Sequence, residues 1–124
     1  AHRMDVSRED ACFIAFSPAA RLAFGYAWRR QDFPWLGRWE ENHSRPGAPW
    51  SSRTLTRGME FGASPFPETR RQMIGRGSLF GVPGYRWIPA KSTVHLRYWA
   101  VLAAAERVPE ALVWTGENNV QFEP

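Results

Sequence analysis

Bulky apolar side chains recur at every second position along much of this chain, and this period of two constrains the fold more than any other feature. In ARLAFGYAWRR, small or charged residues alternate with Leu22, Phe24, Tyr26 and Trp28. Such alternation is typical of a β-strand with one face covered. The segment STVHLRYWAVL, residues 92–102, also alternates but is bulky on both faces. It therefore predicts a strand covered on both sides, as in stacked sheets.

Six further segments carry shorter strand patterns: ACFIAF, FPWLGRWE, TLTRGMEFGA, GYRWIP, EALVW and NVQFE. Pro, Gly, Asn and Ser separate them at intervals of about ten residues, the spacing of a sandwich or barrel. A loop over 42–53 and a short helical turn within 68–76 interrupt the strands, and AVLAAAERVPE is helical by composition. We predict an all-β fold, an antiparallel β-sandwich, with residues 1–124 forming a single domain, because this length supports one core.

Arginine supplies fifteen of the sixteen cations, and the formal net charge is +4. Arginine suits the recognition of carboxylates, phosphates and aromatic rings, although a GC-rich bacterial genome would give the same composition. The cations are scattered among twelve acids rather than gathered in one block, so nucleic acid is not expected as a partner. The seven tryptophans exceed what a core of this size needs, and some of these rings are expected to serve another purpose.

Cys12 is the only cysteine, which excludes an intrachain disulfide and a thiolate metal cluster and fits the reducing cytoplasm. No window approaches the roughly 18 apolar residues of a membrane span, and the first residues are polar, so neither a membrane nor a signal sequence is expected. Phosphate-loop and nucleophile-elbow patterns are missing, and no cofactor is expected. Glu40 and His43 would give a metal only two ligands, so a solvated strand end is preferred there.

Glu60 stands between two glycines in RTLTRGMEFGASPFPE. If residues 55–62 are extended, Gly58, Glu60 and Gly62 share a face, and the acid has no side chain two positions before or after it. A glycine inside a strand often marks the close approach of a ligand or of another backbone. The alternative is that the glycines mark bulges or bends while Glu60 pairs with an arginine. The pattern alone leaves both interpretations open.

Three segments occur in a familiar order: FPWLGRWEENHSR, LTRGMEFGASPFPE and YRWIPAKSTVHLRYWAVL. Together, over residues 33–102, they resemble the C-terminal part of the galactose mutarotase-like family, the aldose 1-epimerases and their relatives. Ala90 and Lys91 stand where that family has a glycine and an acid. The resemblance implies part of a β-supersandwich fold and a sugar or sugar phosphate as ligand. If the chain is an enzyme, it implies an aldose 1-epimerase-like isomerase in which Glu60 takes the anomeric hydroxyl proton.

The same resemblance, with the aromatic and arginine content, nominates the residues that would bind the sugar: Trp39, Asn42, His43, Trp50, Arg53 and Arg57. The rings would stack on the apolar face of the sugar, and the arginines would bind hydroxyls or a phosphate, although Arg57 falls on the strand face opposite Glu60. The family takes its catalytic acid histidine and a second substrate histidine from upstream strands. Neither His43 nor His95 stands at those positions.

Three interpretations follow. The chain is the C-terminal half of a mutarotase-like protein that binds sugar with little catalysis. Alternatively, it completes its site with another copy or with a separate N-terminal half, because half a supersandwich exposes sheet edges and an apolar face. The third interpretation is a non-enzymatic interaction protein that reuses the sheet without a sugar. We favour the first two over the third and expect a homodimer under either.

Overall fold

The computed structural model describes residues 9–116 and 119–123, and its backbone forms two compact units. The sheet unit combines Ala1–Asp32 with Thr93–Pro124, and the hairpin unit is Phe33–Ser92. The strands pair antiparallel throughout, and a single short helix interrupts them in the described ranges, which confirms the predicted all-β class. Because two compact units can belong to one folding domain, a single domain over 1–124 stays a prediction.

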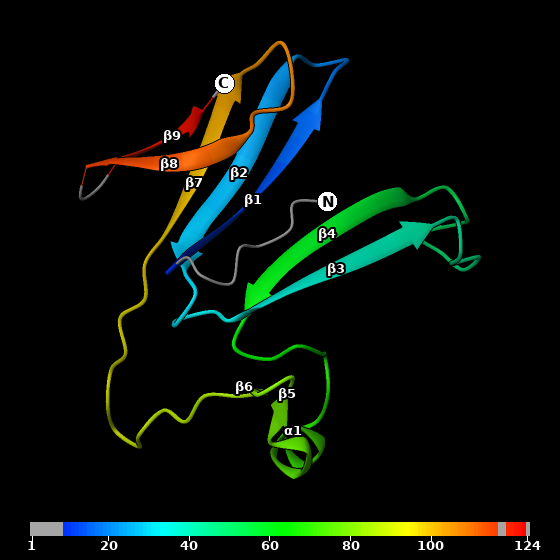
Figure 1. The fold of residues 1–124 in the computed structure, drawn as a ribbon. Helices are drawn as coiled ribbons and strands as arrows, with labels where there is room; N and C mark the ends of the chain where they lie inside the picture. Colours follow the sequence, from blue (N-terminus) through cyan, green and yellow to red (C-terminus); the bar gives the residue numbers. More distant parts are fainter. Residues whose placement is uncertain (1–8, 117–118, 124) are drawn as a thin grey trace. The chain divides into compact units, whose positions relative to one another are not determined.

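Three antiparallel strands form the main sheet of the sheet unit (Figure 1): β1 (Asp10–Ser17), β2 (Leu22–Arg29) and β7 (Tyr98–Ala104), in the order β1-β2-β7. The alternation predicted for the central strand is confirmed. Phe24 and Tyr26 lie on the same face as Phe13 and Tyr98 of the neighbouring strands, where their rings meet edge-on or tilted.

The opposite face of β2 carries its small residues, and there a second layer packs. The hairpin of β8 (Ala111–Gly116) and β9 (Asn119–Glu123) covers this face (Figure 1). A core forms between them, with Ala27, Leu112 and Val120 buried at its centre. A Cβ placed on Gly25 would stand 2.8 Å from Leu112 Cδ1, so only glycine lets the hairpin approach this closely.

The hairpin unit begins with β3 (Trp35–Asn42) and β4 (Leu55–Gly62), joined by a loop over 43–54 that matches the predicted one to within a residue at each end. Helix α1 (Arg70–Arg76) falls inside the predicted turn at 68–76. Thr69 and Gln72 form a capping box at its start, and Gly77 ends it with φ +71°. Two short strands follow, β5 (Ser78–Leu79) and β6 (Val82–Pro83).

Three predicted elements differ from the structure. The strand predicted over 92–102 begins only at Tyr98, and GYRWIP, residues 84–89, is not a strand. Within the described part of the chain, neither residues 92–97 nor GYRWIP has a strand that pairs with it. Alternating side chains do not form a sheet unless another strand supplies the backbone hydrogen bonds. AVLAAAERVPE, which is helical by composition, instead continues β7 to Ala104 and then turns, because β2 pairs with it. None of the described helices is long and apolar enough to cross a membrane.

Candidate functional site

The two glycines that flank Glu60 lie in an unbroken antiparallel ladder between β3 and β4. The register pairs Trp35 with Gly62, Gly37 with Glu60, and Trp39 with Gly58, with no shift between the ends of the strands. The interpretation of these glycines as bulges is therefore wrong, although Gly62 ends β4 directly before a bend at Ala63. Large residues and glycines oppose each other across the strands on this face. Side chains that face each other across a ladder compete for the same space, so a glycine opposite a tryptophan relieves that competition.

Glu60 and Trp39 lie side by side over the backbone of Gly58. A Cβ placed on Gly58 would be 3.5 Å from Trp39 Cε3 and 3.8 Å from Glu60 Oε1. Both side chains are exposed, with 38% of the tryptophan accessible to solvent. The ring and the carboxylate together form a small surface that is apolar on one side and accepts hydrogen bonds on the other. We call this pair, with the glycine below it, the Glu60–Trp39 surface.

The Glu60 carboxylate has no ion pair or hydrogen bond recorded within the described residues. This distinguishes it from the other carboxylates that arginines neutralise: Glu40 with Arg57, Glu41 with Arg45, Glu68 with Arg76, and Glu106 with Arg21. The arginine pairing offered as an alternative for Glu60 is therefore not found in the part of the chain that the structure describes. An exposed carboxylate that keeps its acceptor capacity is available to a ligand.

The end of β3 is fixed by a buried carboxylate. Glu41 is only 3% exposed, and its Oε1 accepts hydrogen bonds from Ser44 N (2.8 Å), Ser44 Oγ (2.7 Å) and Arg45 N (3.2 Å). Arg45 Nε lies 3.1 Å from Glu41 Oε2. The Ser44 side-chain hydrogen bond, with the backbone bonds and the Arg45 charge, holds the pKa of Glu41 below its ordinary value of 4.5 despite burial. The loop is thereby anchored to the strand on the Glu60 side of the hairpin.

Arg45 connects the two tryptophans that the sequence nominated. Its guanidinium carbon lies 5.3 Å from the centre of the Trp39 ring and 5.1 Å from that of the Trp50 ring. These distances suit cation–π attraction, which orients both rings. Trp39 is therefore held from two sides, by Arg45 and by the floor at Gly58.

The remaining predicted binding residues are not on the Glu60–Trp39 surface. Asn42 and Arg57 lie on the opposite face of the hairpin, and Arg57 Nε donates to Glu40 at 2.7 Å, so the predicted wrong-face position of Arg57 is confirmed. His43 is fixed within the loop, with its Nδ1 2.8 Å from the Ser52 carbonyl oxygen. Arg53 is exposed, and its N–H donates to the Trp50 carbonyl at 2.9 Å.

Sequence reasoning missed the residues that organise this end of the hairpin: Glu41, Ser44 and Arg45. From the sequence, WEENHSR is expected to be a solvated strand end. Its signal was present, because a glutamate followed four positions later by an arginine can close a turn by an ion pair, and a serine three positions after an acid can donate to it. The pairing of β3 with β4 decides which of the two glutamates, Glu40 or Glu41, is the one whose side chain is buried.

Comparisons of the chain with models of known protein families, with curated protein sequences and with solved structures found no match. The likeness to mutarotase-like proteins accordingly stays a prediction from three sequence segments. The function is inferred below from the geometry of the β3–β4 hairpin.

Proposed function

We propose that the chain is a carbohydrate-binding module of mutarotase-like type and that the Glu60–Trp39 surface of the β3–β4 hairpin contacts the sugar. One observation carries the proposal: an exposed carboxylate without a recorded arginine partner lies beside an exposed indole, over a glycine floor. Among the described residues no arginine partner is recorded for Glu60, so its carboxylate oxygens remain available to a ligand.

A pyranose fits the chemistry of this surface. Its C–H face packs on an aromatic ring, while its hydroxyls donate hydrogen bonds to a carboxylate, which are about twice as strong as bonds between neutral groups. Gly37 lies opposite Glu60, so no side chain of the neighbouring strand crowds the carboxylate from that position. Arg53, which the resemblance nominates for a phosphate, is exposed but is not on the Glu60–Trp39 surface, so we assign it no contact with the sugar.

We propose binding, rather than ring opening, for this chain by itself. Mutarotation needs an acid on the side of the sugar opposite the base. His43 is held within the loop by the Ser52 carbonyl and has no recorded contact with Glu60 among the described residues, and neither His43 nor His95 stands where the family that the chain resembles has its acid histidine. A general acid would come from a second copy or from a complementary N-terminal half, which keeps the homodimer as part of the proposal. A cytoplasmic location, based on the single cysteine, belongs to it as well.

Ligand-observed NMR with a panel of aldoses and hexose phosphates tests the proposal, and exchange spectroscopy on the same samples measures anomer interconversion. Glu60→Gln and Trp39→Leu are each expected to weaken binding about tenfold, which corresponds to losing one good contact. Glu40→Gln is the matched control, because it neutralises an exposed acid on the other face of the same hairpin. Trp87→Leu removes an exposed tryptophan outside the hairpin.

Binding that both site variants weaken and both controls leave unchanged would support a sugar-binding module. Faster anomer interconversion that Glu60→Gln abolishes would replace the module with a working isomerase. If no sugar binds, or if the control variants weaken binding as much as the site variants, the proposed function is wrong.

A further inference from the structure

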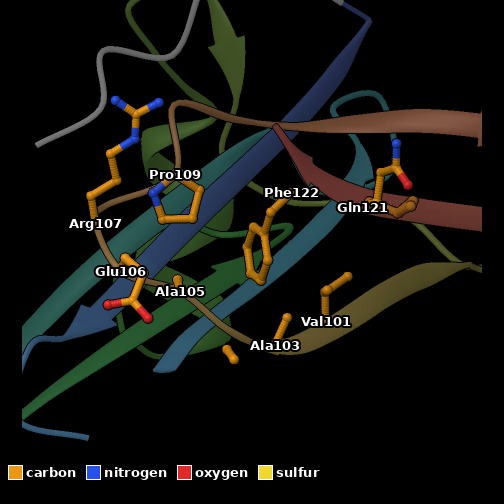
Figure 2. A pocket seen from close by; sticks show the side chains of 10 residues that line it. Val101, Ala103, Ala105, Glu106, Arg107, Pro109, Gln121 and Phe122 are labelled. Atoms are coloured by element: carbon orange, nitrogen blue, oxygen red, sulfur yellow. The ribbon is translucent and has the colours of Figure 1, made fainter. Parts of the chain in front are cut away.

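A largely apolar pocket of about 490 Å³ opens in the sheet unit between β7, β9 and the connection that follows β7. Figure 2 shows Phe122 reaching from β9 toward the strand that carries Val101 and Ala103, with Pro109 beside it. The volume lies in the range of small-ligand sites, and the lining is mostly aliphatic or aromatic. The pocket shares no residue with the Glu60–Trp39 surface.

The pocket follows the edges of two strands rather than one face of a sheet. Ala103 and Ala104 at the end of β7, with Ala105 directly after that strand, line the pocket from one side, and Val120 to Phe122 of β9 line it from the other. Neighbouring residues of a strand point to opposite faces, so a run of consecutive lining residues indicates that the pocket touches the strand edge. In the described sheets, β7 pairs only with β2, and β9 pairs only with β8.

The alternation of hydrogen-bonded and non-hydrogen-bonded pairs between β7 and β2 shows which backbone groups of β7 point to its free edge. The N–H of Ala105 donates to the carbonyl of Arg21 at 3.0 Å, in line with the register that pairs Ala104 with Leu22. Bonded and non-bonded pairs alternate along an antiparallel ladder. Ala103 and Val101 therefore direct their N–H and C=O groups toward β2, and the groups of Leu102 and Ala104 face outward.

We propose that this groove binds an extended peptide segment of a partner protein, which adds to the free edge of β7 as a further strand and places a large apolar side chain in the pocket. Unpaired backbone donors and acceptors along an edge are satisfied by another backbone, and an adjacent pocket that takes alternate side chains supplies selectivity. Tyr98 and Leu102, 56% and 66% exposed, project from the face of β7 opposite the β8–β9 hairpin, and the free edge itself follows from the pairing of β7 with β2 alone in the described sheets.

A second copy of this chain is a poorer fit as the occupant. Trp99 is the large side chain that β7 directs toward the second layer, and it already packs edge-on against Trp114 with 4.2 Å between ring centroids. Beyond it, a pairing β7 would offer the pocket only Val101 and the alanines. A free peptide can present a leucine or phenylalanine instead.

The charges at the rim favour an acidic residue near the end of that peptide. Glu106 is paired with Arg21, whereas Arg107 has no partner recorded within the described ranges. In Figure 2 the guanidinium of Arg107 points away from the apolar side chains, so its charge is at the rim and not inside the pocket. An exposed cation at a rim steers a partner more than it adds to affinity.

Fluorescein-labelled heptapeptides test the proposal by anisotropy with the 124-residue chain. They consist of alternating threonine and valine, with alanine, leucine or phenylalanine at the centre and glutamate at the C-terminus. We expect the leucine and phenylalanine peptides to bind at least about tenfold more tightly than the alanine peptide, because only they fill the pocket. A backbone N-methylated leucine peptide, which lacks ladder donors, is expected to lose at least the same factor.

Two proline variants distinguish a loss of peptide binding at the edge of β7 from a loss of folding. Ala104→Pro removes an outward N–H and is tolerated on an edge strand, so the protein should fold and bind the leucine peptide at least about tenfold more weakly. Ala103→Pro removes an N–H that donates to β2 and is expected to unfold the sheet, which circular dichroism would show. That result would verify which residues of β7 bond to β2 and which face the free edge.

Failure of every peptide to bind at up to about 1 mM would overturn the proposal. Equal binding by the N-methylated peptide and by the Ala104→Pro variant would also overturn it, because the backbone edge would then play no part. If sedimentation shows a dimer that Ala104→Pro converts to a monomer, the edge belongs to a second copy and the peptide proposal is wrong.

Discussion

Two hairpins of this protein, β8–β9 and β3–β4, have the same antiparallel pairing but differ in what stabilises them. The β8–β9 hairpin packs onto the main sheet, and Leu112 at its centre is 7% exposed. In the β3–β4 hairpin, Leu55 is 72% exposed, and the recorded contacts run mainly between its own strands and loop. Burial against a second layer holds one hairpin, whereas cross-strand pairs and a capped loop hold the other.

The glycines of the two regions show the same contrast. Gly25 receives side chains from the β8–β9 layer, with Leu112 Cδ1 2.8 Å and Phe122 Cε1 3.2 Å from an added Cβ, while the carbonyl oxygen of Phe13 on the neighbouring strand β1 would lie at 2.9 Å. Gly58 receives Trp39 from its own partner strand at 3.5 Å, an ordinary van der Waals contact. A glycine in a strand thus admits another layer at Gly25 and a side chain of the partner strand at Gly58.

Leu112→Ala is expected to give the largest effect, a loss of about 2–5 kcal/mol in the free energy of unfolding, because it leaves a cavity between the hairpin and the sheet. Urea denaturation followed by tryptophan fluorescence measures it. Leu55→Ala is the control on the other hairpin and should change stability by less than about 0.5 kcal/mol. Equal losses would show that both hairpins depend on burial to the same extent.

Gly25→Ala is expected to destabilise the protein by about 1–3 kcal/mol, because the new methyl group meets a backbone oxygen that cannot move aside. The penalty should shrink in the Leu112→Ala background, where one of the two clashing groups is gone, and a double-mutant cycle measures this coupling. Gly47→Ala, with nothing within 4 Å of the added Cβ, is the control. A neutral Gly25→Ala would contradict the close approach of β8–β9.

Glu41→Gln is expected to lower stability at neutral pH by less than the two core changes, because it weakens the polar anchor of one loop. The pKa of Glu41 is lowered in the folded state, so its stabilisation is fully present above pH 4.5 and is lost as the pH falls through the lower folded-state pKa. The difference between wild type and variant in thermal midpoint should therefore shrink as the solution is acidified below that pH. Glu40→Gln, with an exposed carboxylate, is the control, and a pH-independent difference would exclude the carboxylate charge as the cause.

Gly58→Ala should have the smallest effect on folding. We expect the free energy of unfolding to increase by up to about 0.5 kcal/mol, because alanine restricts the unfolded chain and its methyl group makes only ordinary contacts. The same methyl group occupies the floor between Trp39 and Glu60, so sugar binding should weaken while stability does not. Denaturation and ligand-observed NMR on one sample measure both. A loss of stability above about 1 kcal/mol would make Gly58 a packing glycine like Gly25.

Local sequence determined those features that depend on neighbours along the chain. The period of two fixed which side chains of β2, β3 and β4 share a face. It also placed Arg57 on the face of β4 that Glu60 does not occupy. The capping residues Thr69 and Gln72, with Gly77 after the last turn, confined α1 to the predicted stretch. These features follow from backbone geometry, which acts over a few residues.

Tertiary structure decided everything that required a partner distant in sequence. Alternation could not show that the small face of β2 would be covered by β8–β9, that residues 93–97 would lack a pairing strand, or that Trp39 would fill the space over Gly58. Nor could it show that Glu60 would be left without a recorded arginine while Glu41 turned inward. The period of a strand fixes the direction of its side chains, but pairing and packing between distant segments decide what those side chains meet.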